Sequence, residues 1–296
     1  MLRRGVHLNR WFCILLTIVM WNAPVHAAVA VSVQALPATI AAAVSVQALP
    51  ATIAAAVADP RRSAANRLRD QYRHPRQTLE FFAVTSASKL VEIYPSGGWY
   101  TEILAPLLKS EGKYYAAHPW VDPNDKKARV EGIRRFQAML AADPVRFDAV
   151  EITAITPPDH TAIAPAGSAD HVLTFRNVHN WLNAGNADGM FTAFFTALKP
   201  GGILGVVEHR AKPGTPLEQM KKFGYVTEDE VIRLAKRAGF ELVARSEINA
   251  NSKDTKDYAE GVWTLPPSYA LGEKDKAKYQ AIGESDRMTL KFRKPR

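Results

Sequence analysis

Residues 91–104 read VEIYPSGGWYTEIL, and this stretch decides the fold. The apolar run Lys89–Tyr94 predicts a β-strand, Pro95–Gly98 a turn, and Tyr100–Lys109 a helix. A glycine turn lets the backbone approach a ligand closely, and the first amides of the following helix have no acceptor inside that helix. The stretch therefore predicts a strand, a turn and a helix, with room for a ligand at the turn.

The rest of the chain alternates apolar strands with amphipathic helices. Further strands are expected at 113–117, 147–153, 169–175, 203–208, 241–246 and 288–292, and helices at 125–142, 187–198 and 228–238. This alternation predicts an α/β fold, a Rossmann-like seven-stranded and mostly parallel sheet with helices on both faces and an antiparallel last strand. Such sheets bind ligands beyond the carboxyl ends of their strands, beside strand one.

The composition is that of a globular protein, with 47% hydrophobic, 23% charged and 9% aromatic residues in 296. It excludes collagen-like, coiled-coil and wholly disordered chains. The only cysteine, Cys13, lies in the first apolar run. A chain that loses this run has no disulfide, thiolate metal site or cysteine nucleophile.

Residues 1–27 have the features of an export signal. Arg3, Arg4 and Arg10 precede or open the apolar run Trp11–Trp21, and Val25–Ala27 offers small residues for cleavage. The alternative is an uncleaved membrane anchor, although the run is shorter than the ~20 residues that cross a bilayer. Removing these residues takes away three arginines and no acids, so the net charge falls from +9 to +6. We expect an exported, periplasmic protein without a stable membrane span.

A tandem repeat follows the signal. AVSVQALPATIAA occupies residues 30–42 and again 43–55. Two uncharged copies that each contain a proline resemble a duplicated linker, and a weak membrane-adhering helix is the alternative. We therefore expect a disordered linker over 28–58 and a folded domain over 59–296.

Six arginines lie between Arg61 and Arg76. A helix with a solvated basic face explains them, and His74–Pro75 should end that helix before another begins near Gln77. Binding to nucleic acid or to an anionic membrane is the alternative. No aromatic stacking pattern lies between the arginines, so a nucleic-acid partner is not expected.

Three segments resemble the class I S-adenosylmethionine-dependent methyltransferase superfamily: VEIYPSGGWYTEIL at 91–104, DHVLTFRNVHNW at 170–181 and LKPGGILGVVEHR at 198–210. The chain also resembles a bacterial group of predicted, often exported methyltransferases through GGWYTEILAP, FRNVHNW, SEINANSKDTKD, EGVWTLPP and IGESDRMTLKF. The resemblance implies this fold, S-adenosylmethionine as cofactor, and a methyltransferase.

The resemblance also implies where the cofactor binds. It assigns the cofactor to Glu92, Tyr94, Ser96, Gly97, Gly98, His118 and Arg176, with Glu92 near the amino acid end. Tyr94 and Ser96 stand where the family has its first two glycines. His118 stands where an acid usually holds the ribose diol, and Asp122 is a possible substitute. The alternatives are a strand-end carboxylate that caps the backbone, a loop histidine and glycines that only mark a turn.

The resemblance also implies that the methyl acceptor binds at the segment after strand four. Arg-Asn-Val resembles small-molecule methyltransferases of the quinone type, so we expect a small-molecule substrate. A hydroxyl or acidic carbon needs a base, for which His179 comes first and His209 second. Both could instead be hydrogen-bonded histidines that fix loops. The expected substrate contacts are Asn177, Asn180 and Trp181, together with Asn249, Asn251 and Trp263 from a long insertion, 249–286, that forms either a lid or surface packing.

Other chemistries match the sequence less well. The G-x-G-x-x-G, P-loop, G-x-S-x-G and H-E-x-x-H motifs are absent, and we expect no metal. Export would place the domain where S-adenosylmethionine is not expected to be abundant. A non-catalytic, exported ligand-binding protein with a degenerate methyltransferase fold is therefore the second hypothesis, and the oligomeric state is left open.

Overall fold

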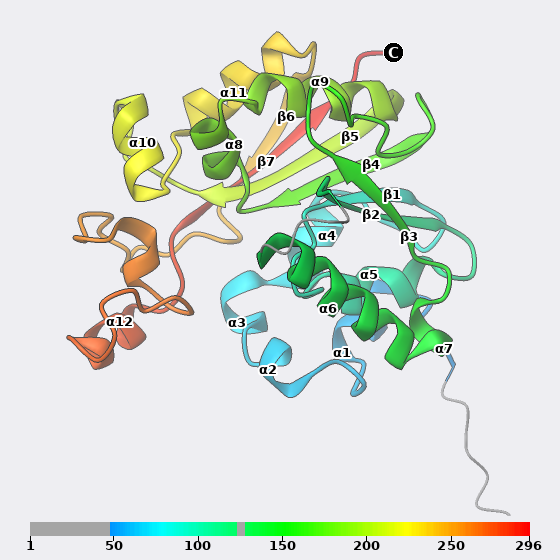
Figure 1. Cartoon of the computed structure of the whole chain (residues 1–296), viewed down its shortest axis with the longest axis horizontal. Helices are drawn as coiled ribbons and strands as arrows, with labels where there is room; N and C mark the ends of the chain where they lie inside the picture. Colours follow the sequence, from blue (N-terminus) through cyan, green and yellow to red (C-terminus); the bar gives the residue numbers. More distant parts are fainter. Residues whose placement is uncertain (1–47, 123–127) are drawn as a thin grey trace, which may run out of the picture. The chain divides into compact units, whose positions relative to one another are not determined.

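The computed structural model describes residues 48–122 and 128–296 (Figure 1). The expected export signal, the first copy of the repeat and the first residues of the expected helix 125–142 lie outside the described residues. Among the described residues, no helix combines the length and the apolar character that crossing a bilayer requires. The described part comprises the expected domain, 59–296, without 123–127, and the residues just before it.

Seven strands form one sheet in the order β3-β2-β1-β4-β5-β7-β6. They are β1 (Lys89–Ile93), β2 (Lys113–Pro119), β3 (Glu151–Ile155), β4 (Ala169–Phe175), β5 (Leu198–His209), β6 (Glu241–Ser246) and β7 (Arg287–Arg293). All neighbouring strands are parallel, except that β7 runs antiparallel to β5 and to β6. The expected sheet and its inserted antiparallel strand are confirmed.

Helices cover both faces of this sheet, as Figure 1 shows. One layer contains α1 (Ile53–Ala58), α4 (Pro75–Phe81), α5 (Thr101–Leu108) and α6 (Ala128–Ala142), and the other contains α8 (Val178–Ala184), α9 (Ala187–Ala197) and α11 (Glu228–Arg237). Side chains of a strand alternate between its faces. Leu90 of β1 packs into the core of the first layer, whereas Val91 and Ile93 pack into the core of the second.

The third strand begins later than expected. Pro144–Phe147 forms the short helix α7, and β3 starts only at Glu151. The side chain of Asp143 accepts a hydrogen bond from the amide of Arg146 at 3.2 Å, and Pro144 occupies the first helical position. Because an N-cap and a proline favour a helix start, Phe147 ends a helix rather than beginning a strand.

The arginine-rich segment also differs from the expectation. It forms two short helices, α2 (Ala64–Arg67) and α3 (Asp70–Arg73), and α4 follows at Pro75. The expected solvated basic face is wrong for two of its arginines, since the side chains of Arg62 and Arg73 are 0% and 5% exposed. Both guanidinium groups lie over the ring of Trp99, at 5.3 and 4.5 Å from its centroid. Cation–π contact and ion pairing keep these charges inside the domain.

The end of the expected linker is helical. The side chain of Thr52 caps α1 by accepting a hydrogen bond from the amide of Ala55 at 3.1 Å. Ala56 of α1 is buried among residues of α4 and α5. The last residues of the second repeat copy therefore belong to the folded domain.

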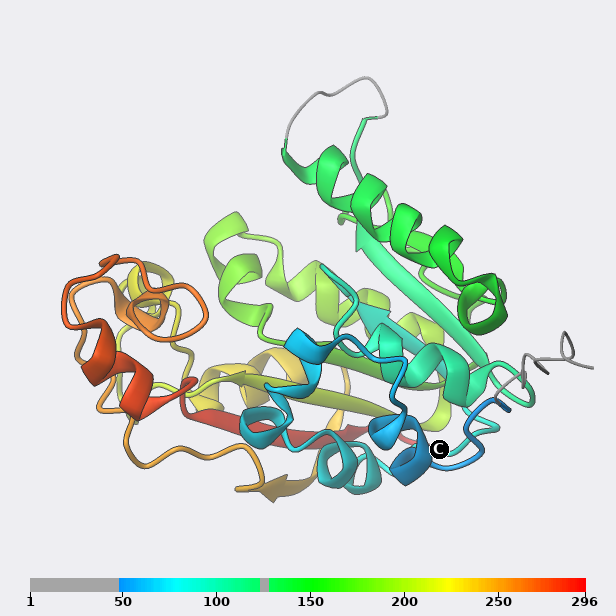
Figure 2. The ribbon, with the colours of Figure 1, turned by 90° about the horizontal axis from the view of Figure 1, so that it is seen from below.

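The long insertion before β7 contains the 3-10 helix η1 (Gly261–Thr264) and α12 (Lys276–Ile282). Its Val262 forms a small core with Ala211 and Tyr225, next to α10 (Leu217–Phe223). Figures 1 and 2 show the insertion, in orange, on the side of the domain opposite to α7. It is an ordered element joined to the end of β5.

Candidate functional site

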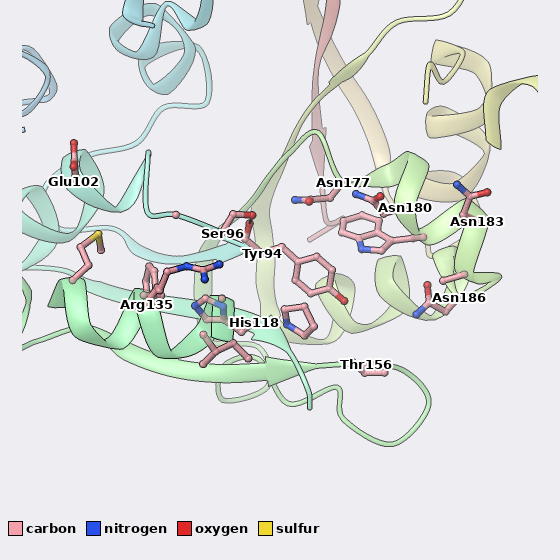
Figure 3. A pocket seen from close by; sticks show the side chains of 18 of the residues that line it. Tyr94, Ser96, Glu102, His118, Arg135, Thr156, Asn177, Asn180, Asn183 and Asn186 are labelled. Carbon is pink, nitrogen blue, oxygen red and sulfur yellow. Dashed lines mark hydrogen bonds between the residues drawn. The ribbon is translucent and has the colours of Figure 1, made fainter. Parts of the chain in front are cut away.

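A cavity of about 1150 Å³ opens at the carboxyl ends of the parallel strands (Figure 3). Its walls come from the turns after β1, β3 and β4, from the end of β2, and from α2, α5, α6 and α8. The lining residues are Ser63, Asn66, Tyr94, Ser96, Gly97, Glu102, His118, Pro119, Gly132, Ile133, Arg135, Phe136, Met139, Thr156, Asn177, Asn180, Trp181, Asn183, Ala184 and Asn186. This is the edge at which α/β sheets bind ligands.

The turn after β1 keeps a glycine-like backbone without the glycines. Tyr94 and Ser96 have φ angles of 53°, and Gly98 has a φ of 79°. All three lie in the left-handed region, which costs a residue with a Cβ atom roughly 1–2 kcal/mol. The backbone shape expected of the family's glycines is thus present, although two of the three residues carry side chains.

Two side chains occupy space near this turn. A Cβ atom on Gly98 would lie 2.7 Å from the terminal methyl of Met139, so α6 packs closely on the turn. Tyr94 packs edge-on to Trp181, with ring centroids 6.0 Å apart. The turn is held between α6 and α8. A Cβ atom on Gly97 would meet no atom within 4 Å, so the space above this residue is open.

Glu92 lies below the turn and outside the lining of the cavity. Its carboxylate accepts a hydrogen bond from the hydroxyl of Tyr114 at 2.5 Å, and Thr101 lies 2.9 Å from the same hydroxyl. Burial raises the pKa of Glu92 to about 7, although the hydrogen bond from Tyr114 acts in the opposite direction. Direct contact between Glu92 and a cofactor remains a prediction.

His118 lines the cavity with an unsatisfied polar atom. Its ring is buried and packs edge-on to Phe136 at 4.5 Å, and Nε2 has no hydrogen-bond partner among the described residues. Burial lowers the pKa of His118 to about 4, so the ring is neutral near pH 7. A neutral imidazole can donate or accept a hydrogen bond with a hydroxyl group. His118 therefore offers a neutral hydrogen-bonding ring beside the cavity.

Two residues that follow β2, Trp120 and the possible substitute Asp122, lie outside the lining. Trp120 stacks on His160 with ring centroids 4.4 Å apart, and neither ring lines the cavity. Asp122 is exposed and is likewise absent from the lining.

Three of the expected acceptor residues line the cavity. They are Asn177, Asn180 and Trp181. The side chain of Asn177 donates to the carbonyl oxygen of Ile93 at 3.0 Å, which ties the end of β4 to β1. Nε1 of Trp181 is buried without a hydrogen-bond partner among the described residues. Of the three, Asn180 is the exposed residue, so this wall offers its side-chain amide to a ligand.

The two histidines proposed as bases flank one buried carboxylate. Nδ1 of His179 lies 3.0 Å from Glu208, which also accepts from the amides of Val178 at 2.5 Å and His209 at 2.8 Å. Because a carboxylate accepts hydrogen bonds, Nδ1 of His179 is the donor in this pair, and Nε2 is the ring nitrogen that remains for a base. A ring held in this way is oriented as a general base requires. Neither histidine belongs to the lining of the cavity.

The second histidine is held differently. Nδ1 of His209 lies 2.5 Å from the hydroxyl of Ser285. Burial lowers the pKa of His209 well below its usual value. His209 is therefore neutral and fixed to the loop before β7.

The same cluster has a donor set that metals use. His179, Glu208 and His209 offer ligand atoms within 4.8 Å of one another. The carboxylate oxygens of Glu208 already accept from two backbone amides and an imidazole. The positive charge of Arg176 also acts on this carboxylate. The donors of the chain itself thus satisfy the cluster, and we assign no metal to it.

The candidate substrate-binding residues of the insertion make contacts that hold the insertion against the rest of the domain. Nδ2 of Asn249 donates to the hydroxyls of Thr78 and Thr289 at 3.1 and 3.0 Å. Nδ2 of Asn251 donates to the carbonyl oxygens of Ile282, at the end of α12, and of Glu284, in the loop before β7. Trp263 packs 6.1 Å from the ring of His179. None of the three lines the cavity.

The structure adds lining residues that the sequence did not single out. Figure 3 shows Glu102 and Arg135 at one end of the cavity and the amides of Asn180, Asn183 and Asn186 at the other. Glu102 is the only carboxylate among the described lining residues, and it accepts a hydrogen bond from the amide of Ser63 at 3.1 Å. The position of Glu102 in the first turn of the helix after the glycine turn is the sequence feature that could have indicated it as a site residue.

Comparisons with known proteins bear on the fold. No protein-family model and no curated protein sequence matches the chain. A solved S-adenosylmethionine-dependent methyltransferase from Aquifex aeolicus is similar to it, with a TM-score of 0.50 and 14% identity over 76% of this chain and 92% of that chain. An arsenic(III) S-adenosylmethionine methyltransferase from Chlamydomonas reinhardtii has a TM-score of 0.48 and 13% identity over 83% of this chain and 74% of that chain.

The strand order, the antiparallel β7 and the helices on both faces are those of the class I methyltransferase fold. Identity at this level shows the fold alone. The function has to be argued from the cavity and its side chains.

Proposed function

We propose that residues 59–296 form an S-adenosylmethionine-dependent methyltransferase that acts on a small-molecule acceptor. The observation that carries the proposal is the unpartnered, buried Nε2 of His118, which lies in a cavity beside the left-handed turn after β1. An orphaned polar atom at this place is explained by a ligand that completes its hydrogen bonding.

The size of the cavity supports a site for two molecules. Small-molecule pockets occupy roughly 300–1,000 Å³, and this cavity measures about 1150 Å³. That volume accommodates a nucleoside cofactor together with a small acceptor. When bound, S-adenosylmethionine would supply an activated methyl group for in-line displacement.

In this proposal, separate residues bind the cofactor, bind the acceptor and accept its proton. His118 binds a hydroxyl of the ribose, and the charged end of the cavity, Glu102 and Arg135, binds the ammonium and carboxylate of the amino acid portion. The amides of Asn180 and Asn183 face the acceptor. His179, oriented by Glu208 and placed in α8 between the lining residues Asn177 and Asn180, is the proposed base for an acceptor whose nucleophile is a hydroxyl or an acidic carbon, and this nucleophile has to reach past the lining of the cavity.

Calorimetry with S-adenosylhomocysteine tests cofactor binding. We expect binding with one site, and a loss of roughly 2–10-fold in affinity in His118→Ala, because a hydrogen bond contributes about 0.5–1.5 kcal/mol. His160→Ala is the matched control, since this histidine lies outside the lining. Absence of binding, or equal losses in both variants, would contradict the proposal.

Turnover tests the assignment of the base. With an acceptor found by screening, His179→Ala should lower the rate by ~10²–10⁴-fold and leave the affinity for S-adenosylhomocysteine unchanged. An unchanged rate would remove His179 from the mechanism. Cofactor binding without any turnover would favour the non-catalytic ligand-binding protein.

We also propose that the protein is exported to the periplasm after cleavage near Ala28, on the basis of the pattern of residues 1–27. Mass spectrometry of the N-terminus in a periplasmic fraction tests this. An intact Met1 on soluble cytoplasmic protein would refute it.

A further inference from the structure

Arginines from three parts of the chain converge on one buried carboxylate. Nε of Arg69 lies 2.5 Å from Glu284, and Nε of Arg73 lies 3.5 Å from the same carboxylate. The guanidinium of Arg287 also donates to Glu284. Arg176, which follows β4, is close enough for its charge to act on Arg287 and Glu284. We call Arg69, Arg73, Arg176 and Arg287 the arginine cluster.

The arginine cluster holds more positive charge than the protein neutralises. Three guanidinium groups contact Glu284, and the charge of the fourth, on Arg176, acts on Glu284 and Glu208. Glu208 already accepts from backbone amides and from His179. The third acid in reach of Arg73 is Glu92, whose raised pKa of about 7 keeps part of it uncharged near neutral pH. Two positive charges thus remain in excess in a largely buried place.

The arginine cluster also has donors that nothing satisfies. The side chain of Arg73 is 5% exposed, and its Nη2 has no hydrogen-bond partner among the described residues. Its Nε reaches Glu284 only at ion-pair distance. Nη2 of Arg69 is buried without a partner as well. Burial, followed by the charge of Arg176, lowers the pKa of Arg73 to about 8. Such crowding is unfavourable unless an anion offsets it.

The arginine cluster adjoins residues that line the cavity. Arg176 precedes Asn177, which lines the cavity. Arg73 lies over the ring of Trp99, whose Nε1 donates to the carbonyl oxygen of the lining residue Asn66 at 3.0 Å. The side chain of Arg69 is 25% exposed and Arg176 is half-buried, so part of the cluster reaches the surface of the domain.

We propose that the arginine cluster binds an oxyanion, a carboxylate or phosphate group, carried by the methyl acceptor; its assignment to the acceptor rests on the proposed function. Guanidinium forks match the geometry of both groups and bind them with two parallel hydrogen bonds. The unpartnered donors of Arg73 and Arg69 supply such bonds. A polyanion such as a nucleic acid would need an exposed basic surface, whereas these side chains are mostly buried.

Inorganic phosphate and acetate are the probes, titrated into the full chain and followed by calorimetry and thermal unfolding. Binding of phosphate identifies a phosphate site, and binding of acetate alone identifies a carboxylate site. In Arg73→Met, affinity should fall by roughly tenfold or more, since a hydrogen bond to a charged group contributes about 1.5–3 kcal/mol. Without added anion, the melting temperature of this variant should not fall, because the charge crowding is relieved.

The matched control is Arg76→Met, an arginine of α4 whose side chain is 59% exposed and paired with Glu80. It should bind either anion as the wild type does. Arg176→Met is the second variant and should weaken binding in the same way as Arg73→Met. Failure of both anions to bind, or equal affinity in wild type, Arg73→Met and Arg176→Met, overturns the proposal.

Titration of S-adenosylhomocysteine into the same proteins separates the two proposals. If it binds while neither anion does, the anion site alone is overturned. If it does not bind while phosphate binding depends on Arg73, the anion site is supported as a ligand site, and the proposed function fails together with the assignment to a methyl acceptor.

Discussion

Replacing Glu92 by glutamine should change how the stability of the protein depends on pH. The carboxyl group is 3% exposed and accepts one hydrogen bond from Tyr114. Burial raises its pKa from 4.5 to about 7, against the opposing effects of Tyr114, Thr101 and the charge of Arg73. A carboxyl group with a raised pKa binds its proton more tightly in the folded state. Its contribution to stability is complete below pH 4.5 and is lost as the pH rises through about 7.

The size of the effect follows from the two pKa values. A difference of one pKa unit corresponds to about 1.4 kcal/mol. The rise from 4.5 to about 7 therefore removes roughly 3 kcal/mol of unfolding free energy between acidic and alkaline pH. Glu92→Gln has no proton to lose at this site, so its stability relative to wild type should increase by about that amount between pH 4 and pH 9. For a domain of this size, this corresponds to roughly 6–12 °C in melting temperature.

Urea and thermal unfolding of both proteins across this pH range measure the effect. Glu111→Gln is the control, because it makes the same chemical change at an exposed carboxylate that accepts from the hydroxyl of Ser86. If Glu92→Gln and Glu111→Gln show the same dependence of stability on pH relative to wild type, the buried carboxyl group of Glu92 does not have the raised pKa that the structure indicates.

Two further predictions concern the backbone, each measured by urea unfolding. Ser96→Gly should stabilise the protein by about 0.5–1 kcal/mol, because relief of a left-handed φ outweighs the added entropy of the unfolded chain. Ser110→Gly is the control and should destabilise the protein, since Ser110 is exposed and has no positive φ. A change of the same sign in both variants would refute the reasoning. Gly261→Ala should cost roughly 3 kcal/mol or more, since its φ is +54° and a Cβ atom would overlap the backbone of Phe223. Gly272→Ala, with a φ of +61° and open space, should cost only about 1 kcal/mol; equal losses would show that the close approach to Phe223 is not real.

The sheet could be predicted from the sequence because its strands are short apolar runs bounded by turns. The expected strands 169–175 and 241–246 match β4 and β6 in both bounds. The site could be predicted in part for the same reason, since parallel strands bring their carboxyl ends to one edge. Tyr94, Ser96, His118 and Asn177 accordingly meet at one cavity.

What the sequence could not indicate depends on contacts between distant residues. Arg69 and Glu284 are 215 positions apart, so the local pattern of charges predicted a solvated helix face. Side-chain identity also concealed the backbone of the turn, because tyrosine and serine only rarely adopt a left-handed φ. The pairing of His179 with Glu208 joins two segments in the same way.

The position of β7 sets the order in which the sheet can be completed. Among the described residues, β6 pairs only with β7, and β7 follows it after residues 247–286, which include the whole insertion 249–286. During synthesis, the open edge of β5 therefore stays without its neighbour until β7 has emerged, and β6 has no strand to join. We expect arrested chains that end before residue 287 to be cleaved by protease around β5, and longer chains to be protected. Until then, an unpaired strand edge is available to other chains, so a holding chaperone would act in this interval.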